Sequence, residues 1–334
     1  MDIDQAPASL PPLDVERPKA WTRESISPDG WLISLPEPCV AELDEVVASL
    51  RATPRPIETL SPDAFALDGC RAVMARVRAK LETDTGLAVV DRFPVERYAI
   101  EESRAIGWLL AAMLGQVVAQ KVSGARLYDV KDTGQALGYG VRRSVTNLGQ
   151  PFHTDGGWLW KAPAFVGLFC LESALEGGLS RFVSLVTAHH ELRRQRPDLL
   201  ARLYRPFMWD RQGEHVPNAL RVSEQPVYEY ADGVLQARYY EDYIRNGCQL
   251  AGVELDAEGS EALEALGEIV DDPTNWVEFR IEKGQLQYLN NRQFAHSRTA
   301  FKDTAAPGQG PGRHMLRLWN RDEGSWHLEG QPGA

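Results

Sequence analysis

From residue 127 onward, the chain is a succession of short apolar runs separated by turn-forming residues. Few of these runs alternate with helical segments, so the pattern favours two packed antiparallel sheets over a doubly wound parallel sheet. We therefore predict a mainly β protein with flanking helices and a double-stranded β-helix (jelly-roll) core. The predicted strands are Leu127–Val130, Val141–Asn147, Ala164–Leu171, Arg181–Leu185, Tyr204–Asp210, Val227–Tyr230, Val234–Arg238, Trp276–Arg280, Leu286–Asn290 and His314–Asn320.

Helical spacing of apolar residues marks the flanking elements. The predicted helices are Ala41–Ala52, Gly69–Leu81, Ala105–Gln120, Thr187–Arg194, a short one from Pro197 and Ala257–Val270. Residues 1–20, rich in Pro, Asp and Ala, are predicted to be a flexible N-terminal segment. Residues 21–334 are predicted to form a single jelly-roll domain with a lid-like insert at about 204–250. The insert carries candidate pocket-wall tyrosines whose alternation is equally typical of sheet packing, namely Tyr228, Tyr230, Tyr239, Tyr240 and Tyr243.

Charge and cysteine content limit the classes of partner. The 36 basic and 47 acidic residues give a net charge of −11, which argues against nucleic-acid binding because phosphate neutralisation needs clustered Lys and Arg. The four cysteines are widely spaced, and the N-terminus has neither a basic start nor an apolar core, so we expect a cytoplasmic protein. No apolar run reaches the length needed to span a membrane. We expect a small-molecule substrate. These features are compatible with either a monomer or a homo-oligomer.

The tripeptide His153-Thr154-Asp155 has the composition of a metal site. In an extended strand, His153 and Asp155 point to the same face, so one metal could contact both. Two imidazoles and one carboxylate hold iron(II) on one face and leave the opposite positions open. By itself the tripeptide is a common pattern, and a distant histidine, His296, is needed to complete the set.

Four sequence motifs follow one another along the chain: Pro-Phe-His-Thr-Asp, Gly-Gly-x-Ser, Asn-Asn-Arg-x-x-x-His-x-Arg-Thr-Ala-Phe and Arg-His-x-Leu-Arg-x-Trp. With them the chain, from roughly Pro36 to Arg321, resembles the iron(II)- and 2-oxoglutarate-dependent oxygenases of the taurine dioxygenase and 2,4-dichlorophenoxyacetate dioxygenase family, which includes clavaminate synthase-like enzymes. The resemblance implies that the iron ligands are His153, Asp155 and His296.

The same resemblance implies that Arg313 pairs with the distal carboxylate of 2-oxoglutarate and that Ser180 contacts it. A guanidinium fork matches a carboxylate, and a hydroxyl adds a hydrogen bond. Arg317 shares a strand face with Arg313 and is expected either to anchor an anionic group of the substrate or to form an ion pair. Further tentative substrate residues are Asn147, Trp158 and Arg298, the last of which could equally form a structural ion pair. His189 and His190, adjacent on a predicted helix, are predicted to be surface residues.

The resemblance implies a dioxygenase reaction in which 2-oxoglutarate and O₂ are consumed and succinate and CO₂ are released. Asp155 favours hydroxylation over halogenation, because halogenating relatives have a small residue at that position. Desaturation or cyclisation by the same cofactors is an alternative. Two other classes retain parts of the pattern, a non-catalytic jelly-roll binding protein and a zinc hydrolase. Neither needs Arg313 together with Ser180. The substrate is expected to be a small polar metabolite or amino acid derivative.

Overall fold

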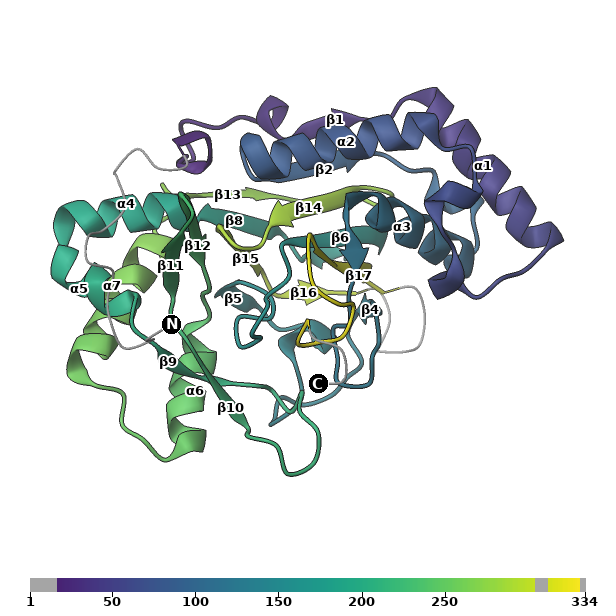
Figure 1. Ribbon diagram of the computed structural model, residues 1–334. Coiled ribbons are helices and arrows are strands. Elements are labelled where there is room, and N and C mark those ends of the chain that lie inside the picture. Colours follow the sequence, from purple (N-terminus) through teal and green to yellow (C-terminus); the bar gives the residue numbers. More distant parts are fainter. Residues whose placement is uncertain (1–16, 304–311, 331–334) are drawn as a thin grey trace.

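A computed structural model describes residues 17–303 and 312–330 (Figure 1). Residues 1–16 of the predicted flexible segment lie outside the described residues. The described chain begins with a 3-10 helix at Arg17–Lys19. Lys19 is buried, and its backbone carbonyl accepts a hydrogen bond of 2.6 Å from the Ser184 hydroxyl. The chain is therefore held to the domain from the first described residues.

The larger sheet has seven strands among the described residues, in the order β1-β2-β14-β6-β17-β3 with β4 also paired to β17. Its strands are β1 Leu32–Ser34, β2 Leu87–Asp91, β3 Gln116–Val117, β4 Leu127–Val130, β6 Phe165–Glu172, β14 Leu286–Asn290 and β17 His314–Arg321. All the pairs are antiparallel except β1 with β2. The central strands are buried on both faces, which explains their nearly continuous apolar sequence.

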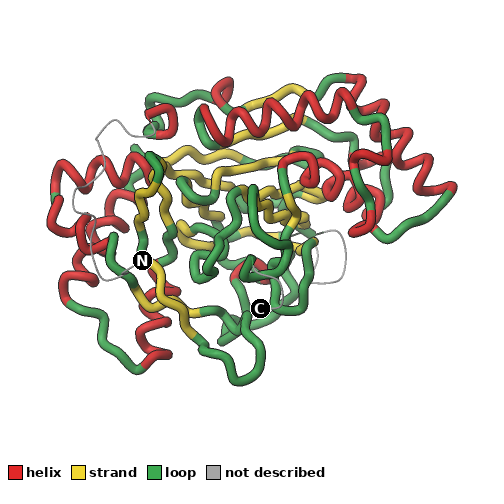
Figure 2. The backbone as a smooth tube through the Cα atoms, viewed as in Figure 1, coloured by secondary structure: helices red, strands yellow, loops and turns green. Residues whose placement is uncertain are grey.

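The smaller sheet has the order β13-β8-β15-β5 and lies against the larger one (Figure 2). Its strands are β5 Gln150–His153, β8 Ser180–Ser184, β13 Trp276–Phe279 and β15 Phe294–Arg298. Three two-stranded pairs complete the strands: β7 Glu176–Gly177 with β16 Phe301–Lys302, β9 Phe207–Asp210 with β10 Val222–Gln225, and β11 Tyr228–Ala231 with β12 Val234–Ala237.

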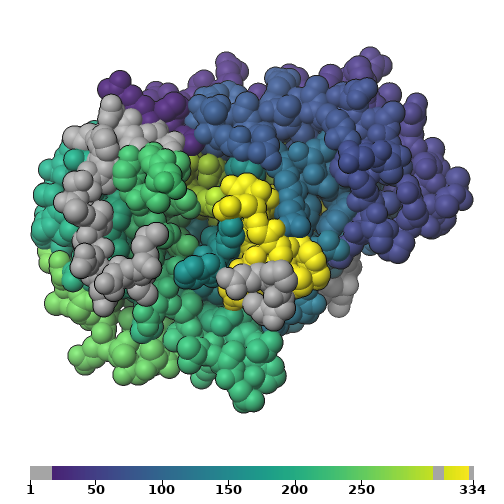
Figure 3. All heavy atoms as spheres, in the orientation of Figure 1, coloured from purple at the N-terminus to yellow at the C-terminus, as the bar shows by residue number. Residues whose placement is uncertain are grey.

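Two groups of helices cover this β core (Figure 1). The first group packs on the larger sheet and consists of α1 Glu37–Ala52, α2 Asp68–Thr83 and α3 Ile100–Leu114. The second group consists of α4 Leu185–Gln195, α5 Pro197–Leu203, α6 Glu241–Ala251 and α7 Ala257–Asp271. Short 3-10 helices lie at Pro28–Gly30, Ile57–Thr59, Pro62–Ala64, Val95–Arg97 and Arg143–Val145. The C-terminal residues, yellow in Figure 3, lie on the viewed face between the two groups.

Two predictions for individual elements are wrong. The segment Val141–Asn147 is a loop with one 3-10 turn, because the Thr146 hydroxyl and backbone N–H both bond the Arg143 carbonyl. The predicted helix Ala105–Gln120 ends at Leu114, where a Cβ on Gly115 would lie 2.7 Å from the Arg321 carbonyl oxygen of β17. Helix α6 lies at the end of the predicted insert, in a stretch for which no element had been predicted.

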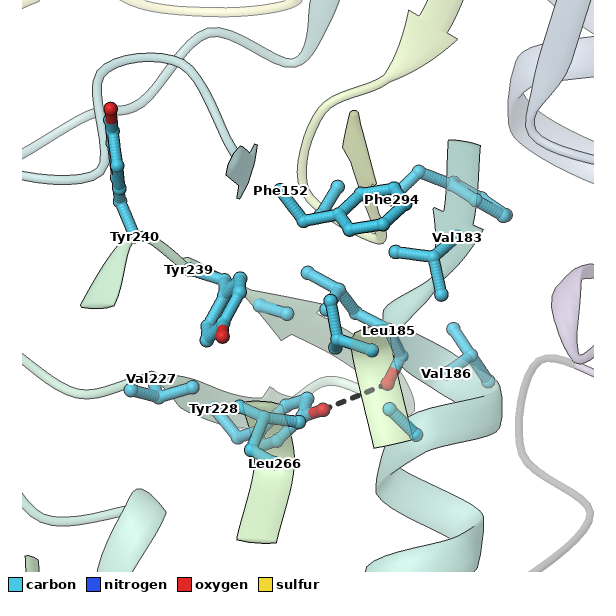
Figure 4. Close-up of a cluster of buried hydrophobic side chains, with 14 of the residues drawn as sticks. Phe152, Val183, Leu185, Val186, Val227, Tyr228, Tyr239, Tyr240, Leu266 and Phe294 are labelled. Carbon is cyan, nitrogen blue, oxygen red and sulfur yellow. Dashed lines mark hydrogen bonds between the residues drawn. The ribbon is translucent and has the colours of Figure 1, made fainter. Parts of the chain in front are cut away.

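The prediction that His189 and His190 lie on the surface is also wrong. Both are buried, since the face of α4 that carries them packs into the main core. The His189 ring lies 5.1 Å from the ring of Tyr228, whose hydroxyl donates to the Leu185 carbonyl (Figure 4). His189 Nε2 and the Tyr204 hydroxyl are 2.8 Å apart. Burial lowers the pKa of His189 to about 3, so the imidazole is neutral in the folded protein.

Acidification should therefore destabilise the fold through His189. The unfolded chain takes up a proton near pH 6.5 while the folded one does not, so stability is lost as pH falls below 6.5. Between pH 7 and pH 5 the wild type should lose about 2 kcal/mol more than His189→Gln. Urea unfolding of both proteins across this range checks the difference. Equal pH slopes would show that His189 accepts a proton in the folded state.

Gly167 on β6 lies directly opposite Tyr288 on β14. A Cβ at Gly167 would lie 2.5 Å from the Tyr288 ring, which is fully buried. Gly167→Ala should therefore lower the free energy of unfolding by about 1–3 kcal/mol through overpacking. Thermal unfolding checks this, with Gly138→Ala as the matched control because a Cβ there meets nothing within 4 Å. A similar loss in both variants would contradict the packing explanation.

Candidate metal centre and cosubstrate cavity

His153 and His296 are direct neighbours across two antiparallel strands. His153 ends β5, His296 lies in the middle of β15, and the two residues pair in register. Their ring centroids are 4.2 Å apart. Asp155 follows just beyond β5, and one ligand atom from each of the three residues lies within 4.8 Å of the others. Strand pairing thus brings together residues that are far apart in the sequence.

The hydrogen bonds of His153 select the ring nitrogen that faces the cluster. Nδ1 lies 2.9 Å from the Pro151 carbonyl oxygen, to which it can only donate. Nε2 is then the unprotonated nitrogen, available as a metal ligand. It lies 2.8 Å from the Gln150 side-chain nitrogen and 3.8 Å from Asp155 Oδ1. His153 is therefore oriented for coordination through Nε2.

Asp155 is held by contacts from several parts of the chain. Its carboxylate accepts hydrogen bonds from Arg317 Nη1 at 3.1 and 3.3 Å and from Trp319 Nε1 at 3.0 Å. The side chain of Asn291 bonds both the backbone N–H and the carbonyl of Asp155, at 2.8 and 2.9 Å. Asp155 lies in a turn after β5, so these contacts, and not the strand alternation used in the prediction, set its direction.

The protonation states of the cluster suit a divalent cation. Burial opposes the charged carboxylate, but Arg317, His296 and His153 outweigh it and hold the pKa of Asp155 at about 2. Burial, together with the neighbouring His153, lowers the pKa of His296 to about 3, and burial also lowers the pKa of His153. Two neutral imidazoles and one carboxylate are a donor set that fits iron(II).

Arg313 and Ser180 line the same cavity as the two histidines. The cavity lies between the sheets, with Gln287 and Arg317 from the larger sheet and Ser180 and His296 from the smaller one. Arg313 is 3% exposed, its Nη1 has no hydrogen-bond partner among the described residues, and burial lowers its pKa to about 10. A buried N–H group without a partner is costly, so this part of the cavity fits a carboxylate such as that of 2-oxoglutarate.

The four tentative substrate residues have different positions. Arg317 lies in the cavity, where it pairs with Asp155, while its Nη2 has no partner. Arg298 also lines the cavity. Asn147 is exposed, and its backbone carbonyl accepts a hydrogen bond from Phe301. Trp158 is buried, with its ring 5.7 Å from that of Tyr243.

A second, larger cavity of about 590 Å³ adjoins the metal cluster across Tyr240. The Tyr240 ring lies 5.0 Å from the His153 ring and 3.9 Å from the Tyr243 ring. Tyr240 belongs to the same buried cluster as Tyr228 and Tyr239, but its hydroxyl points away from the other side chains drawn in Figure 4. The remaining walls are mostly polar and include Arg143, Asp210, Gln212, Arg221, Asp242, Asn246 and Gln249.

Sequence reasoning missed several residues that support the cluster. Trp319 and Asn291 contact Asp155, and Gln120 accepts a 2.8 Å hydrogen bond from Arg317 Nε. The period of two along β17 puts Trp319 on the same face as Arg317, so that signal was present in the sequence. No sequence pattern around Gln120 indicated that it would contact Arg317.

Comparisons with known proteins agree with the fold and the cluster. The family described as "Taurine catabolism dioxygenase TauD, TfdA family" matches residues 59–319. The chain is 27% identical over 303 residues to FR-33289 synthase of Streptomyces rubellomurinus, covering 90% of this chain and 88% of that protein. It is 26% identical over 326 residues to the taurine hydroxylase-like protein SAT17 of Stachybotrys chartarum, covering 92% and 80%.

Two solved structures share the fold. An asparagine oxygenase in complex with Fe(II), 3-hydroxyasparagine and succinate aligns with a TM-score of 0.62 at 19% identity, over 87% of this chain and 94% of that chain. The non-haem iron oxygenase OrfP in complex with Fe and α-ketoglutaric acid aligns with a TM-score of 0.63 at 14% identity, with the same coverage. The jelly-roll prediction is confirmed. With the family match over most of its length, the chain belongs to the TauD/TfdA family of iron(II)- and 2-oxoglutarate-dependent dioxygenases.

Proposed function

We propose that this protein hydroxylates a C–H bond of a small polar metabolite or amino acid derivative. In this proposal His153, Asp155 and His296 hold iron(II), while Arg313 and Ser180 hold the distal carboxylate of 2-oxoglutarate. The observation that carries it is the placement of Arg313, whose Nη1 has no partner among the described residues, in the same cavity as both histidines of the cluster. A zinc hydrolase or a binding protein would have no use for this second anion site.

When bound, iron(II) together with 2-oxoglutarate and O₂ would supply the oxidation that replaces a hydrogen atom on the substrate carbon by a hydroxyl group, with release of succinate and CO₂. One oxygen atom of O₂ enters succinate and the other enters the product. The chain provides neutral histidines that need no deprotonation before coordination, and a carboxylate that Arg317, Trp319 and Asn291 keep in place. Burial of these groups excludes water from the reacting atoms.

A polar substrate is supported by the cavity beyond Tyr240. Opposite charges line it, with Arg143 Nη2 and Asp242 Oδ2 3.9 Å apart, so a zwitterionic amino acid could meet both signs. The structural relatives with bound 3-hydroxyasparagine and (3S)-hydroxy-L-Arg point to the same class. Arg317 pairs with Asp155 through Nη1, and its Nη2, which has no partner among the described residues, is our candidate contact for a substrate carboxylate.

We extend the proposal to the organisation of the chain. Residues 21–334 would form one catalytic domain, in which the insert at about 204–250 covers the cavity mouth through Tyr240 and Tyr243. No helix among the described residues is long and apolar enough to cross a membrane. All four cysteines are buried and unpaired, which supports a reducing, cytoplasmic setting.

Anaerobic addition of iron(II) and then 2-oxoglutarate tests the cofactor assignment. A weak charge-transfer band in the visible should appear in the wild type and be absent in His296→Ala, which lacks one iron ligand. Half-buried His215 provides the control, since it lies outside the cavity of the cluster and His215→Ala should keep the band. Absence of the band in the wild type would contradict the proposed cofactor assignment.

Substrate identity is tested by succinate formation across a panel of amino acids, both free and carrier-tethered, sulfonates and aryloxyacids. We expect the highest turnover with a zwitterionic or carboxylate-bearing amino acid derivative. A product that gains one oxygen atom indicates hydroxylation, whereas loss of two hydrogen atoms indicates desaturation or cyclisation. Stimulation only by uncharged, apolar compounds would contradict the polar-substrate proposal.

A further inference from the structure

Arg298 is a buried cation for which the described residues supply no carboxylate partner. It is 7% exposed, and its Nε and Nη1 have no hydrogen-bond partner. Its remaining nitrogen, Nη2, donates to backbone carbonyls, which carry only partial charge. A buried charge is normally retained only when it is paired. Among the described residues, Asp132 attracts Arg298 electrostatically but forms no ion pair with it, so the guanidinium can still take up an anion.

The strand register places Arg298 beside the predicted cosubstrate contacts. Arg298 pairs directly with Ser180 of β8, and His296 lies two residues earlier on the same face of β15. Arg313 approaches from the other side: the Phe301 ring centroid lies 4.9 Å from the Arg298 guanidinium carbon and 5.4 Å from that of Arg313. Arg298, Arg313 and Ser180 therefore line one part of a single cavity, to which they bring two guanidinia that each have N–H groups without a partner among the described residues, and one hydroxyl.

The third nitrogen of Arg298 connects this cavity to the neighbouring loop. Nη2 lies 2.9 Å from the Thr146 carbonyl oxygen and 3.5 Å from that of Arg143, and it also bonds the Leu148 carbonyl. The Arg143 and Thr146 carbonyls belong to the segment that had been predicted as a strand, and Leu148 follows directly after it. The same loop carries the Arg143 side chain into the wall of the larger cavity beyond Tyr240.

We propose that Arg298, together with Arg313, binds the distal carboxylate of 2-oxoglutarate, and that the same guanidinium holds loop 143–148 in place for the substrate. The inference rests on the proposed function and assigns a second cation to its cosubstrate site. A guanidinium is planar and rigid, so an anion that binds either Nε or Nη1 also fixes the direction of Nη2. Cosubstrate binding thereby orders the loop that carries Arg143.

The test is an anaerobic titration of the iron(II)-loaded full chain with two ligands, followed through the visible charge-transfer band. One ligand is 2-oxoglutarate, and the other is 2-oxopentanoate, which has the same chain length and the same chelating end but no distal carboxylate. In Arg298→Gln the affinity for 2-oxoglutarate should fall by about 10- to 100-fold, while that for 2-oxopentanoate should stay within about twofold. Arg298→Lys, which keeps the charge, should be intermediate.

Arg292→Gln is the matched control, because Arg292 lies in the same stretch but pairs with Asp322 outside the cavity. It should bind both ligands like the wild type. If Arg298→Gln lost affinity equally for both ligands, Arg298 would only support the fold, and the inference would be overturned. Unchanged affinity for both ligands would overturn it as well. A wild type without any band would instead reject the proposed function, and this inference with it.

Hydrogen exchange reports on the loop separately from catalysis. Amides of residues 143–149 should become more protected when 2-oxoglutarate binds to the wild type, and this gain should be lost in Arg298→Gln at saturating ligand. 2-Oxopentanoate should give little protection in either protein. Equal protection by both ligands in the wild type would overturn the coupling between cosubstrate and loop.

Discussion

Asp155→Ala should abolish turnover and lower iron(II) affinity by more than about 100-fold. Loss of an outer partner of a metal ligand typically costs about 10- to 100-fold, and here the only carboxylate of the cluster is removed. Iron(II) affinity is measured by competition with a chromophoric chelator under anaerobic conditions. Glu254→Ala removes an exposed carboxylate and should change neither quantity. Undiminished iron binding in Asp155→Ala would exclude Asp155 as a ligand.

The same substitution should destabilise the metal-free protein. Arg317 and Asp155 form a buried ion pair, so removing Asp155 leaves Arg317 charged and unpaired in the interior. The expected loss in the free energy of unfolding is about 3–5 kcal/mol. The double variant Asp155→Ala/Arg317→Met should recover a large part of it, because no buried charge remains. Failure of the double variant to recover stability would mean that the ion pair is not the source of the effect.

Arg313→Ala should weaken 2-oxoglutarate binding by about 100- to 1,000-fold, which is the expected cost of losing one partner of a buried ion pair. Iron binding should be retained, since Arg313 contacts none of the three cluster residues. The charge-transfer titration separates these effects: the band should still form, but only at much higher 2-oxoglutarate concentration.

Two variants test the specificity of this result. Arg313→Lys keeps the charge without the guanidinium fork and should lie between wild type and Arg313→Ala. Lys302→Ala removes an exposed cation next to Phe301 and should have no effect. Unchanged 2-oxoglutarate affinity in Arg313→Ala would remove Arg313 from the cosubstrate site.

Much of the fold followed from local pattern. Strands such as Leu286–Asn290 and Leu127–Val130 were predicted with the bounds that the structure shows, because a short apolar run bounded by turn residues has few other stable conformations. Helix 257–271 was found within one residue because its apolar spacing is regular and Asp256 caps its first turn.

The errors occurred where tertiary contacts outweighed that pattern. Loop 143–148 has β-forming residues, but its carbonyls face the Arg298 guanidinium and cannot join a sheet. His189 looked polar and exposed, yet it lies in the core between two tyrosines that come from later parts of the chain. Neither outcome depends on residues close enough in sequence to be read locally.

The order of residues along the chain was enough to predict the candidate groups of the site: the His-x-Asp pair, the distant histidine and the arginines that follow it. These are chemical identities, and their spacing along the chain is enough to predict the donor set. The folded chain was needed to show that His153 and His296 pair across two strands, that Arg317 and Trp319 hold Asp155, and that Arg298 shares the cavity of Arg313. Strand register and the packing of one sheet on another set these contacts, and both are long-range properties of the closed β core.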